Sequence, residues 1–202
     1  MSKIKICGLY RKEDIEYANE VRPDYIGFII NFPKSHRNLS PEDAKALKEK
    51  LDENIKAVGV FVDQSIEYVS EAAEIIGLDV IQLHGHEDEE YIKTLRDKTD
   101  RMIWKAFKVR SEEDLKSAEN SIADEILLDN GYGTGETFDW DLINDFKRPF
   151  ILAGGLTPGN IKEAVGKYDP NIVDISSGVE TDKVKDKSKM QAAVDAVRGG
   201  VL

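Results

Sequence analysis

The sequence predicts an α/β protein of the (β/α)8-barrel (TIM-barrel) class, with residues 1–202 forming one domain. Short runs rich in β-branched residues alternate with segments whose apolar residues recur at helical spacing. Eight such units follow one another without a linker or low-complexity tract. Alternating units require parallel strands with right-handed crossovers, and eight close most simply into a barrel. An open doubly wound sheet is the alternative, although no Gly-x-Gly-x-x-Gly turn follows the first strand.

The expected strands are short, and several end in a turn residue or a polar side chain. The first alternates charged and apolar residues and carries Cys7, the single cysteine, to the turn at Gly8. The second, Asp24–Ile30, is apolar on both faces. In order, the eight strands are expected at residues 3–8, 24–30, 55–62, 79–83, 102–107, 124–129, 149–153 and 171–175.

Helices are expected between the strands, where apolar residues recur every three or four positions. Ser40 before Pro41 is an N-cap followed by proline at the first helical position. Ser65 can cap the next helix, and Ser111 begins another with a box-like cap. The helical segments are expected at residues 12–21, 41–51, 65–76 and 87–96, after 111, around 140–146, around 161–165 and around 190–197.

The composition excludes several classes of protein. A net charge of −11 argues against broad binding to nucleic acid or to an anionic membrane, since both need a basic face. A small anionic substrate is still compatible with it. One cysteine cannot form an internal disulfide, and no apolar run approaches the roughly 20 residues of a membrane span. Because the first strand follows Met1 and Ser2 directly, no signal peptide is expected, and the expected location is the cytoplasm.

The candidate functional residues gather at the carboxyl ends of the strands, which share one mouth in such a barrel. Together they offer a thiol, several carboxylates, a guanidinium, an imidazole and two glycine-rich turns. These residues are Cys7, Arg37, Asp63, Gln82, His84, Asp129, Gly154, Gly155 and the run from Asp174 through Ser177 to Gly178.

Two glycine-rich turns follow strands seven and eight, where barrels commonly bind phosphate with backbone amides and a short helix. They are Gly154-Gly155 and Ser176-Ser177-Gly178. Glycine lets the backbone approach an anion closely or adopt positive φ. Either turn alone is equally compatible with an ordinary tight turn, and their joint position favours a phosphate site.

Other residues have both a structural and a chemical interpretation. Cys7 is either a small buried apolar residue or a reactive thiol. Asp129 is either a turn residue or an acid whose pKa is raised by the apolar run 126–128. Arg37 is either part of a solvated basic loop or a guanidinium that grips a carboxylate.

Two further patterns give weaker signals. His84 and His86 suggest a metal site, but zinc would need a third ligand of suitable geometry, so none is expected. Gly133-Thr134-Gly135 lacks the Lys-Ser/Thr ending of a phosphate loop, and we interpret it as a mobile loop over the mouth.

Over essentially its whole length, the chain resembles the phosphoribosylanthranilate isomerase family. Each motif is short, and their order and spacing together carry the resemblance. The motifs are Lys5-Ile6-Cys7-Gly8, Ser35-His36-Arg37, Val58-Gly59-Val60-Phe61, Gln82-Leu83-His84-Gly85, Leu128-Asp129, Gly133-Thr134-Gly135 with Phe138-Asp139-Trp140, Leu152-Ala153-Gly154-Gly155-Leu156 and Val173-Asp174-Ile175-Ser176-Ser177-Gly178-Val179-Glu180.

The resemblance implies an Amadori rearrangement of N-(5-phosphoribosyl)anthranilate in tryptophan biosynthesis, with no cofactor. It assigns the general acid to Asp129, the general base to Cys7 and the grip on the anthranilate carboxylate to Arg37. A base must be partly thiolate, so a modest depression of the usual thiol pKa of ~8.5 would help. The resemblance places phosphate on the backbone of Gly154, Gly155, Ser177 and Gly178, and lines the sugar and reacting centre with Gln82, His84 and Asp174.

Two positions depart from the family pattern: His36 replaces the usual proline before Arg37, and Tyr132 stands where a second glycine often precedes the Gly-Thr-Gly. Another sugar-phosphate isomerase or epimerase barrel is an alternative. The histidine-pathway isomerase uses paired aspartates, so Cys7 argues against it. A non-catalytic barrel that binds a phosphate ligand is the second alternative, and intact Cys7 and Asp129 argue against it. Monomer and homodimer both remain open.

Overall fold

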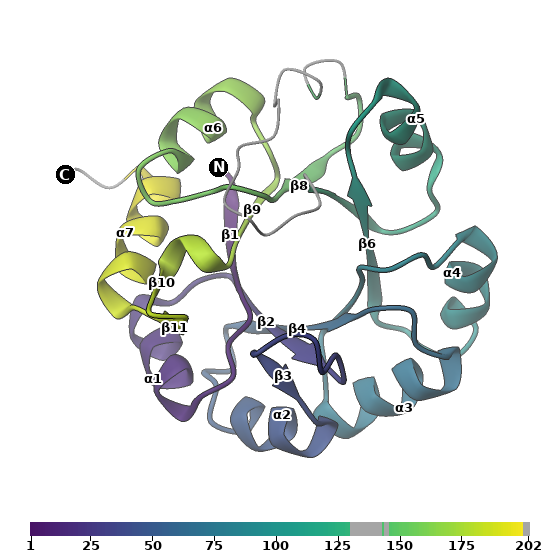
Figure 1. Cartoon of the computed structure of the whole chain (residues 1–202), viewed down its shortest axis with the longest axis horizontal. Helices are drawn as coiled ribbons and strands as arrows, with labels where there is room; N and C mark the ends of the chain where they lie inside the picture. The colour runs from purple at the N-terminus through teal and green to yellow at the C-terminus, as the bar shows by residue number, and fades with distance from the viewer. Residues whose placement is uncertain (130–142, 144–145, 200–202) are drawn as a thin grey trace.

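The structure, a computed structural model, describes residues 1–129, 143 and 146–199. Its centre is a closed barrel of eight parallel strands (Figure 1). These are β1 (Lys3–Cys7), β2 (Tyr25–Ile30), β4 (Lys56–Phe61), β5 (Val80–Leu83), β6 (Met102–Lys108), β7 (Glu125–Asp129), β8 (Phe150–Leu152) and β9 (Ile172–Ile175). Neighbours in the chain pair with each other, and β1 closes the barrel by pairing with both β2 and β9. The predicted fold class is confirmed.

Helices surround the barrel on the outside (Figure 1). The described helices are α1 (Lys12–Val21), α2 (Pro41–Lys48), α3 (Ile66–Ile76), α4 (Glu89–Arg96), α5 (Glu112–Asn120), α6 (Ile161–Tyr168) and α7 (Lys187–Arg198). The predicted caps are confirmed, because the side chains of Ser40, Ser65 and Ser111 accept hydrogen bonds from backbone amides in the first turn. The helix expected around residues 140–146 falls largely outside the described residues.

One helix begins later than predicted. The sequence suggested a start at Glu87, whereas α4 begins at Glu89 with Asp88 as its N-cap. The reason is that the Glu87 side chain is buried, where it accepts hydrogen bonds from the amides of Asp63 at 2.7 Å and Gly85 at 2.9 Å. Glu87 therefore belongs to the loop between β5 and α4, which its carboxylate organises.

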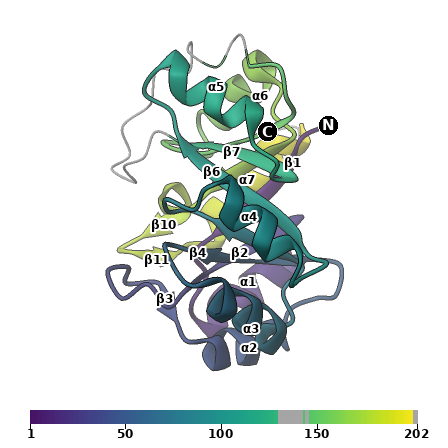
Figure 2. The ribbon, with the colours of Figure 1, turned by 90° about the vertical axis from the view of Figure 1, so that its right-hand side faces the viewer.

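Three additional short strands lie at one end of the barrel. β3 (Asn38–Leu39) follows Arg37 directly and pairs in parallel with β2. β10 (Glu180–Thr181) and β11 (Val184–Lys185) form an antiparallel hairpin after β9. Figure 2 shows β3 and this hairpin at the same end of the barrel, opposite the N-terminus.

The core has two parts, because successive strand residues face opposite sides. Ile4 and Ile6 of β1 pack outward in the larger cluster, between strands and helices. A smaller cluster fills the barrel interior, where the rings of Tyr25 and Trp104 meet edge to face at 5.1 Å. Because side chains fill the middle of the barrel, a ligand site is expected at one of its open ends. None of the described helices combines the length and apolar character that a membrane crossing requires.

Candidate active site

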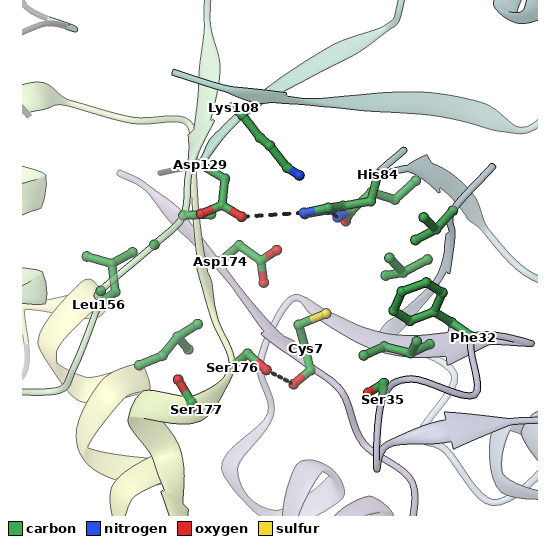
Figure 3. A pocket seen from close by; sticks show the side chains of 18 residues that line it. Cys7, Phe32, Ser35, His84, Lys108, Asp129, Leu156, Asp174, Ser176 and Ser177 are labelled. Carbon is green, nitrogen blue, oxygen red and sulfur yellow. Dashed lines mark hydrogen bonds and ion pairs between the residues drawn. The ribbon is translucent and has the colours of Figure 1, made fainter. Parts of the chain in front are cut away.

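A cavity of about 420 Å³ opens at the carboxyl ends of the strands. Figure 3 shows the side chains of Cys7, Asp129 and Asp174 facing the same open space. The predicted residues that line the cavity are Cys7, Gln82, His84, Asp129, Gly154, Gly155, Asp174 and Ser177. Arg37 and Gly178 are not among the lining residues.

Cys7 ends β1 and is 9% exposed. Its carbonyl oxygen accepts a hydrogen bond from Ser176 Oγ at 3.0 Å, which ties β1 to the loop after β9 (Figure 3). Burial raises the pKa of the Cys7 thiol, and the nearby Lys5 ammonium only partly opposes this effect, whereas Asp174 adds to it. The structure therefore does not supply a depressed thiol pKa, because desolvation outweighs the nearby cation.

A chain of polar side chains joins Asp129, at the end of β7, to β5. Nε2 of His84 lies 3.4 Å from Oδ2 of Asp129 (Figure 3). On the other side of the ring, Nδ1 of His84 lies 3.0 Å from Nε2 of Gln82. An amide nitrogen only donates, so Nδ1 accepts and the neutral ring carries its proton on Nε2. His84 therefore directs an N–H group at the Asp129 carboxylate.

Asp174 lies in β9 and is 8% exposed. Its Oδ2 accepts a hydrogen bond from Nζ of Lys5 at 2.7 Å, and these two residues are register partners on adjacent strands. No described residue bonds to the buried Oδ1. Lys5 was not predicted as a functional residue, although strand alternation places it on the same face as Cys7.

The two glycine-rich turns lie at one side of the cavity, which Leu156 and Ser177 mark in Figure 3. Gly154 has φ 89° and Gly155 has φ 66°, a conformation that strongly favours glycine. Gly178 has a different role, because a Cβ atom there would lie 2.0 Å from the carbonyl oxygen of Leu156. Gly178 thus allows the loop after β9 to touch the loop after β8.

Arg37 is engaged with another protein side chain. Its Nε and Nη2 donate to the two carboxylate oxygens of Glu180, both at 2.7 Å. Glu180 also accepts from Nζ of Lys185 at 2.7 Å. Burial raises the pKa of Glu180, but hydrogen bonds from Arg37 and the charge of Lys185 outweigh it and hold that pKa below its usual value. Two cations and one carboxylate leave this cluster with a net positive charge.

Two lysines near the end of β6 were not predicted from the sequence. Lys108 ends β6 and lines the cavity, and it is the register partner of Asp129. It was missed because the strand was expected to stop at Phe107. Lys105, two residues before Phe107, is buried and pairs with Glu87 at 3.1 Å. Strand alternation places Lys108 on the inward face of β6 and Lys105 on the outward face, and neither lysine gives a distinct sequence signal.

The two histidines of the His-Gly-His segment face different carboxylates. His84 faces Asp129, whereas Nδ1 of His86 lies 3.0 Å from Asp63. Within the described part of the chain, no three His, Cys, Asp or Glu side chains form a group that could hold a metal ion. Nε2 of His36, the departure from the family loop, lies 3.2 Å from the carbonyl oxygen of Lys183. Tyr132 and Gly133–Gly135 lie outside the described residues.

Comparisons with known proteins place this geometry in a family. Residues 4–196 match the family described as N-(5′-phosphoribosyl)anthranilate (PRA) isomerase. The chain is 48% identical over 201 residues to N-(5′-phosphoribosyl)anthranilate isomerase from Clostridium kluyveri, covering 98% of each protein.

Two solved structures share the fold throughout. Phosphoribosyl anthranilate isomerase from Thermotoga maritima is 36% identical, with a TM-score of 0.89 over 98% of this chain and 100% of that one. A phosphoribosyl anthranilate isomerase in complex with reduced 1-(o-carboxyphenylamino)-1-deoxyribulose 5-phosphate is 35% identical, with a TM-score of 0.87 over the same shares. This chain belongs to the N-(5′-phosphoribosyl)anthranilate isomerase family.

Proposed function

We propose that this chain isomerises N-(5-phosphoribosyl)anthranilate to 1-(2-carboxyphenylamino)-1-deoxyribulose 5-phosphate, a step of tryptophan biosynthesis, in the cytoplasm. The whole barrel acts as one catalytic domain on this small-molecule substrate. The observation that carries the proposal is the placement of Cys7 and Asp129, from strands far apart in sequence, in one cavity beside two glycine-rich turns. The product analogue bound by a family member of the same fold supports it.

Asp129 is the general acid in this mechanism. It protonates the ribose ring oxygen while the C1′–O bond breaks and the anthranilate nitrogen lone pair forms a C=N bond. The acid must carry a proton when substrate binds, and His84 is placed to stabilise the carboxylate left after transfer. The product of this step is an open-chain cationic Schiff base.

Cys7 is the general base. Its thiolate takes the proton from C2′, and the C–H electrons form a C1′=C2′ bond while the C=N electrons return to nitrogen. The resulting enolamine becomes the ketone when the C2′ hydroxyl loses its proton and C1′ gains one. Because burial raises the pKa of Cys7, the thiolate needs a neighbouring positive charge, and the Schiff base supplies one.

Positioning comes from the two ends of the substrate, each of which carries an anion. The backbone of Gly154, Gly155 and Ser177 is the proposed phosphate site, with Gly178 allowing the loops to meet. Arg37 holds the anthranilate carboxylate with Nη1, which has no hydrogen bond to a described residue, while Nε and Nη2 remain on Glu180. Fixing both ends places the ribose between acid and base.

Gln82, His84 and Asp174 complete the proposed sugar site. Oδ1 of Asp174 and Oε1 of Gln82 are buried, with no hydrogen-bond partner in the part of the chain that the structure describes. A buried oxygen without a partner is costly, and substrate hydroxyls can satisfy both. The positive cluster of Arg37, Glu180 and Lys185 makes the mouth attractive to an anion despite the net charge of −11.

The decisive experiment follows the loss of phosphoribosylanthranilate fluorescence with wild type, Cys7→Ser and Asp129→Asn. Each substitution should lower kcat by about 10²- to 10⁴-fold, the usual contribution of a general acid or base. Asp63→Asn is the matched control, because Asp63 also follows a strand but pairs with His86 outside the cavity. Its kcat should stay within about twofold of wild type.

The outcomes separate the alternatives. Wild type that is inactive at saturating substrate refutes the assignment, and retained phosphate-ligand binding would then favour a non-catalytic barrel. Turnover of another phosphorylated sugar, but not of this substrate, would favour a different isomerase or epimerase. Near-full activity of Asp129→Asn would refute the acid role while leaving the reaction in place.

A further inference from the structure

Lys5 is a fully buried cation beside the Cys7 thiol. It is 0% exposed and lies two residues before Cys7 in β1, so both side chains point into the barrel. A methyl group on Gly27, the register partner of Cys7 in β2, would lie 2.7 Å from Sγ of Cys7 and 3.2 Å from Cε of Lys5. The thiol and the end of the lysine chain are therefore immediate neighbours.

Asp174 shares this ammonium group. Its Oδ2 lies 2.7 Å from Nζ of Lys5, and both side chains are buried. With a neutral thiol the lysine and the aspartate balance in charge. When Cys7 loses its proton, the same site holds two negative charges and one positive charge, with little water to solvate them.

Lys5 is the charged group nearest to the thiol that shares its strand, and it carries its proton. Burial lowers the pKa of Lys5, but Asp174 and Cys7 raise it more, so this lysine stays protonated. Its bond to Asp174 holds the ammonium group in the barrel interior. Further charged or titratable groups face the thiol from other elements around the mouth of the barrel. They are Arg37, Lys185, His84, Lys108 and Asp129.

We propose that Lys5 is a positioning residue whose ammonium ion is the counterion of the Cys7 thiolate, and that Asp174 limits its effect by sharing it. This inference rests on the proposed function, in which Cys7 is the base. The proton that first leaves Sγ passes to water, and the proton taken from C2′ then forms the new S–H bond. Lys5 keeps its own protons throughout and stabilises the charge on sulfur.

The test measures Cys7 ionisation directly, through the rate of alkylation by iodoacetamide as a function of pH. Cys7 is the only cysteine, so the label reports this thiol alone. Lys5→Met should raise the apparent thiol pKa by about 1 unit or more, because an adjacent opposite charge shifts a pKa by roughly 1 to 3 units. Asp174→Asn should lower it, since the ammonium is then no longer shared.

Two further variants keep the result interpretable. Lys3→Met removes an exposed lysine from the same strand and face, at the opposite end of the barrel, and should leave the alkylation profile unchanged. Lys5→Met leaves Asp174 buried without a partner and can fail to fold. The double variant Lys5→Met/Asp174→Asn avoids this problem, and its thiol pKa should lie above that of Asp174→Asn alone.

The outcomes either support or overturn the inference. Opposite shifts for Lys5→Met and Asp174→Asn support it, as does the difference between the double variant and Asp174→Asn. An unchanged thiol pKa in Lys5→Met overturns the inference. Equal thiol pKa values in the double variant and in Asp174→Asn overturn it as well. A wholly structural role for Lys5 would lower stability without moving the thiol pKa. Alkylation needs no turnover, so inactive wild type would refute the proposed function without bearing on the alkylation result.

Discussion

Gly178→Ala should force apart the two loops that we assign to the phosphate site. The added Cβ would lie 2.0 Å from the carbonyl oxygen and 3.0 Å from the carbonyl carbon of Leu156, and both are backbone atoms. Close carbon–oxygen contacts are normally about 3.3 to 3.6 Å. One loop must therefore move by about 1 Å or more, and no side-chain rotation can relieve the contact.

The geometry sets the expected size of the effect. Overpacking of this kind costs about 1 to 3 kcal/mol. For a chain of 202 residues, each kcal/mol lowers the melting temperature by about 2 to 4 °C, so Gly178→Ala should melt roughly 2 to 12 °C below wild type. Each hydrogen bond to a charged group contributes about 1.5 to 3 kcal/mol, so loss of one phosphate contact should raise KM about tenfold or more.

Thermal unfolding and steady-state kinetics test the prediction together. Gly166→Ala is the matched control, because Gly166 lies within α6 and a Cβ added there would meet open space. That substitution should stabilise the protein by about 0.5 to 1 kcal/mol and leave KM unchanged. If Gly178→Ala has the same melting temperature and KM as the wild type, the argument that the two loops are in rigid contact is refuted.

Three further predictions concern the charged groups. The depressed pKa of Glu180 means that its stabilising effect is fully present above its unfolded pKa of ~4.3 and is lost as the pH falls through its lower folded value. Between about pH 5 and pH 3, the melting temperature of Glu180→Gln should therefore fall less steeply than that of wild type. Lys105→Met should lower the free energy of unfolding, measured in urea, by about 3 to 5 kcal/mol, because it leaves the buried Glu87 carboxylate without its cation. Arg37→Lys should raise KM about tenfold or more with a smaller change in kcat, since lysine cannot reproduce the paired bonds to Glu180.

Each of these predictions has its own check. Lys93→Met removes an exposed lysine 3.9 Å from Glu90 and should change the free energy of unfolding by less than about 0.5 kcal/mol. A loss equal to that of Lys105→Met would contradict the burial argument. A Glu180→Gln variant as acid-sensitive as wild type would contradict the pH argument. A large fall in kcat at unchanged KM would assign Arg37 to the chemical step.

The sequence alone determined the order of strands and helices and the residues at the strand ends. These features depend on short-range physics: apolar residues at regular spacing bury one face, and serines at positions 40, 65 and 111 satisfy free amides of the next turn. Parallel strands then bring their carboxyl ends to one mouth, which is why the strand-end positions of Cys7 and Asp129 were enough to predict that they share it.

Only the tertiary structure decided the ionic partners. Lys5 and Asp174 are 169 residues apart, and Arg37 and Glu180 are 143 apart. Their contacts depend on closure of the barrel between β1 and β9, and on a register that aligns Lys5 with Asp174. The rise in the Cys7 pKa has the same origin, because desolvation and neighbouring charge are properties of the assembled barrel that no local stretch of sequence contains.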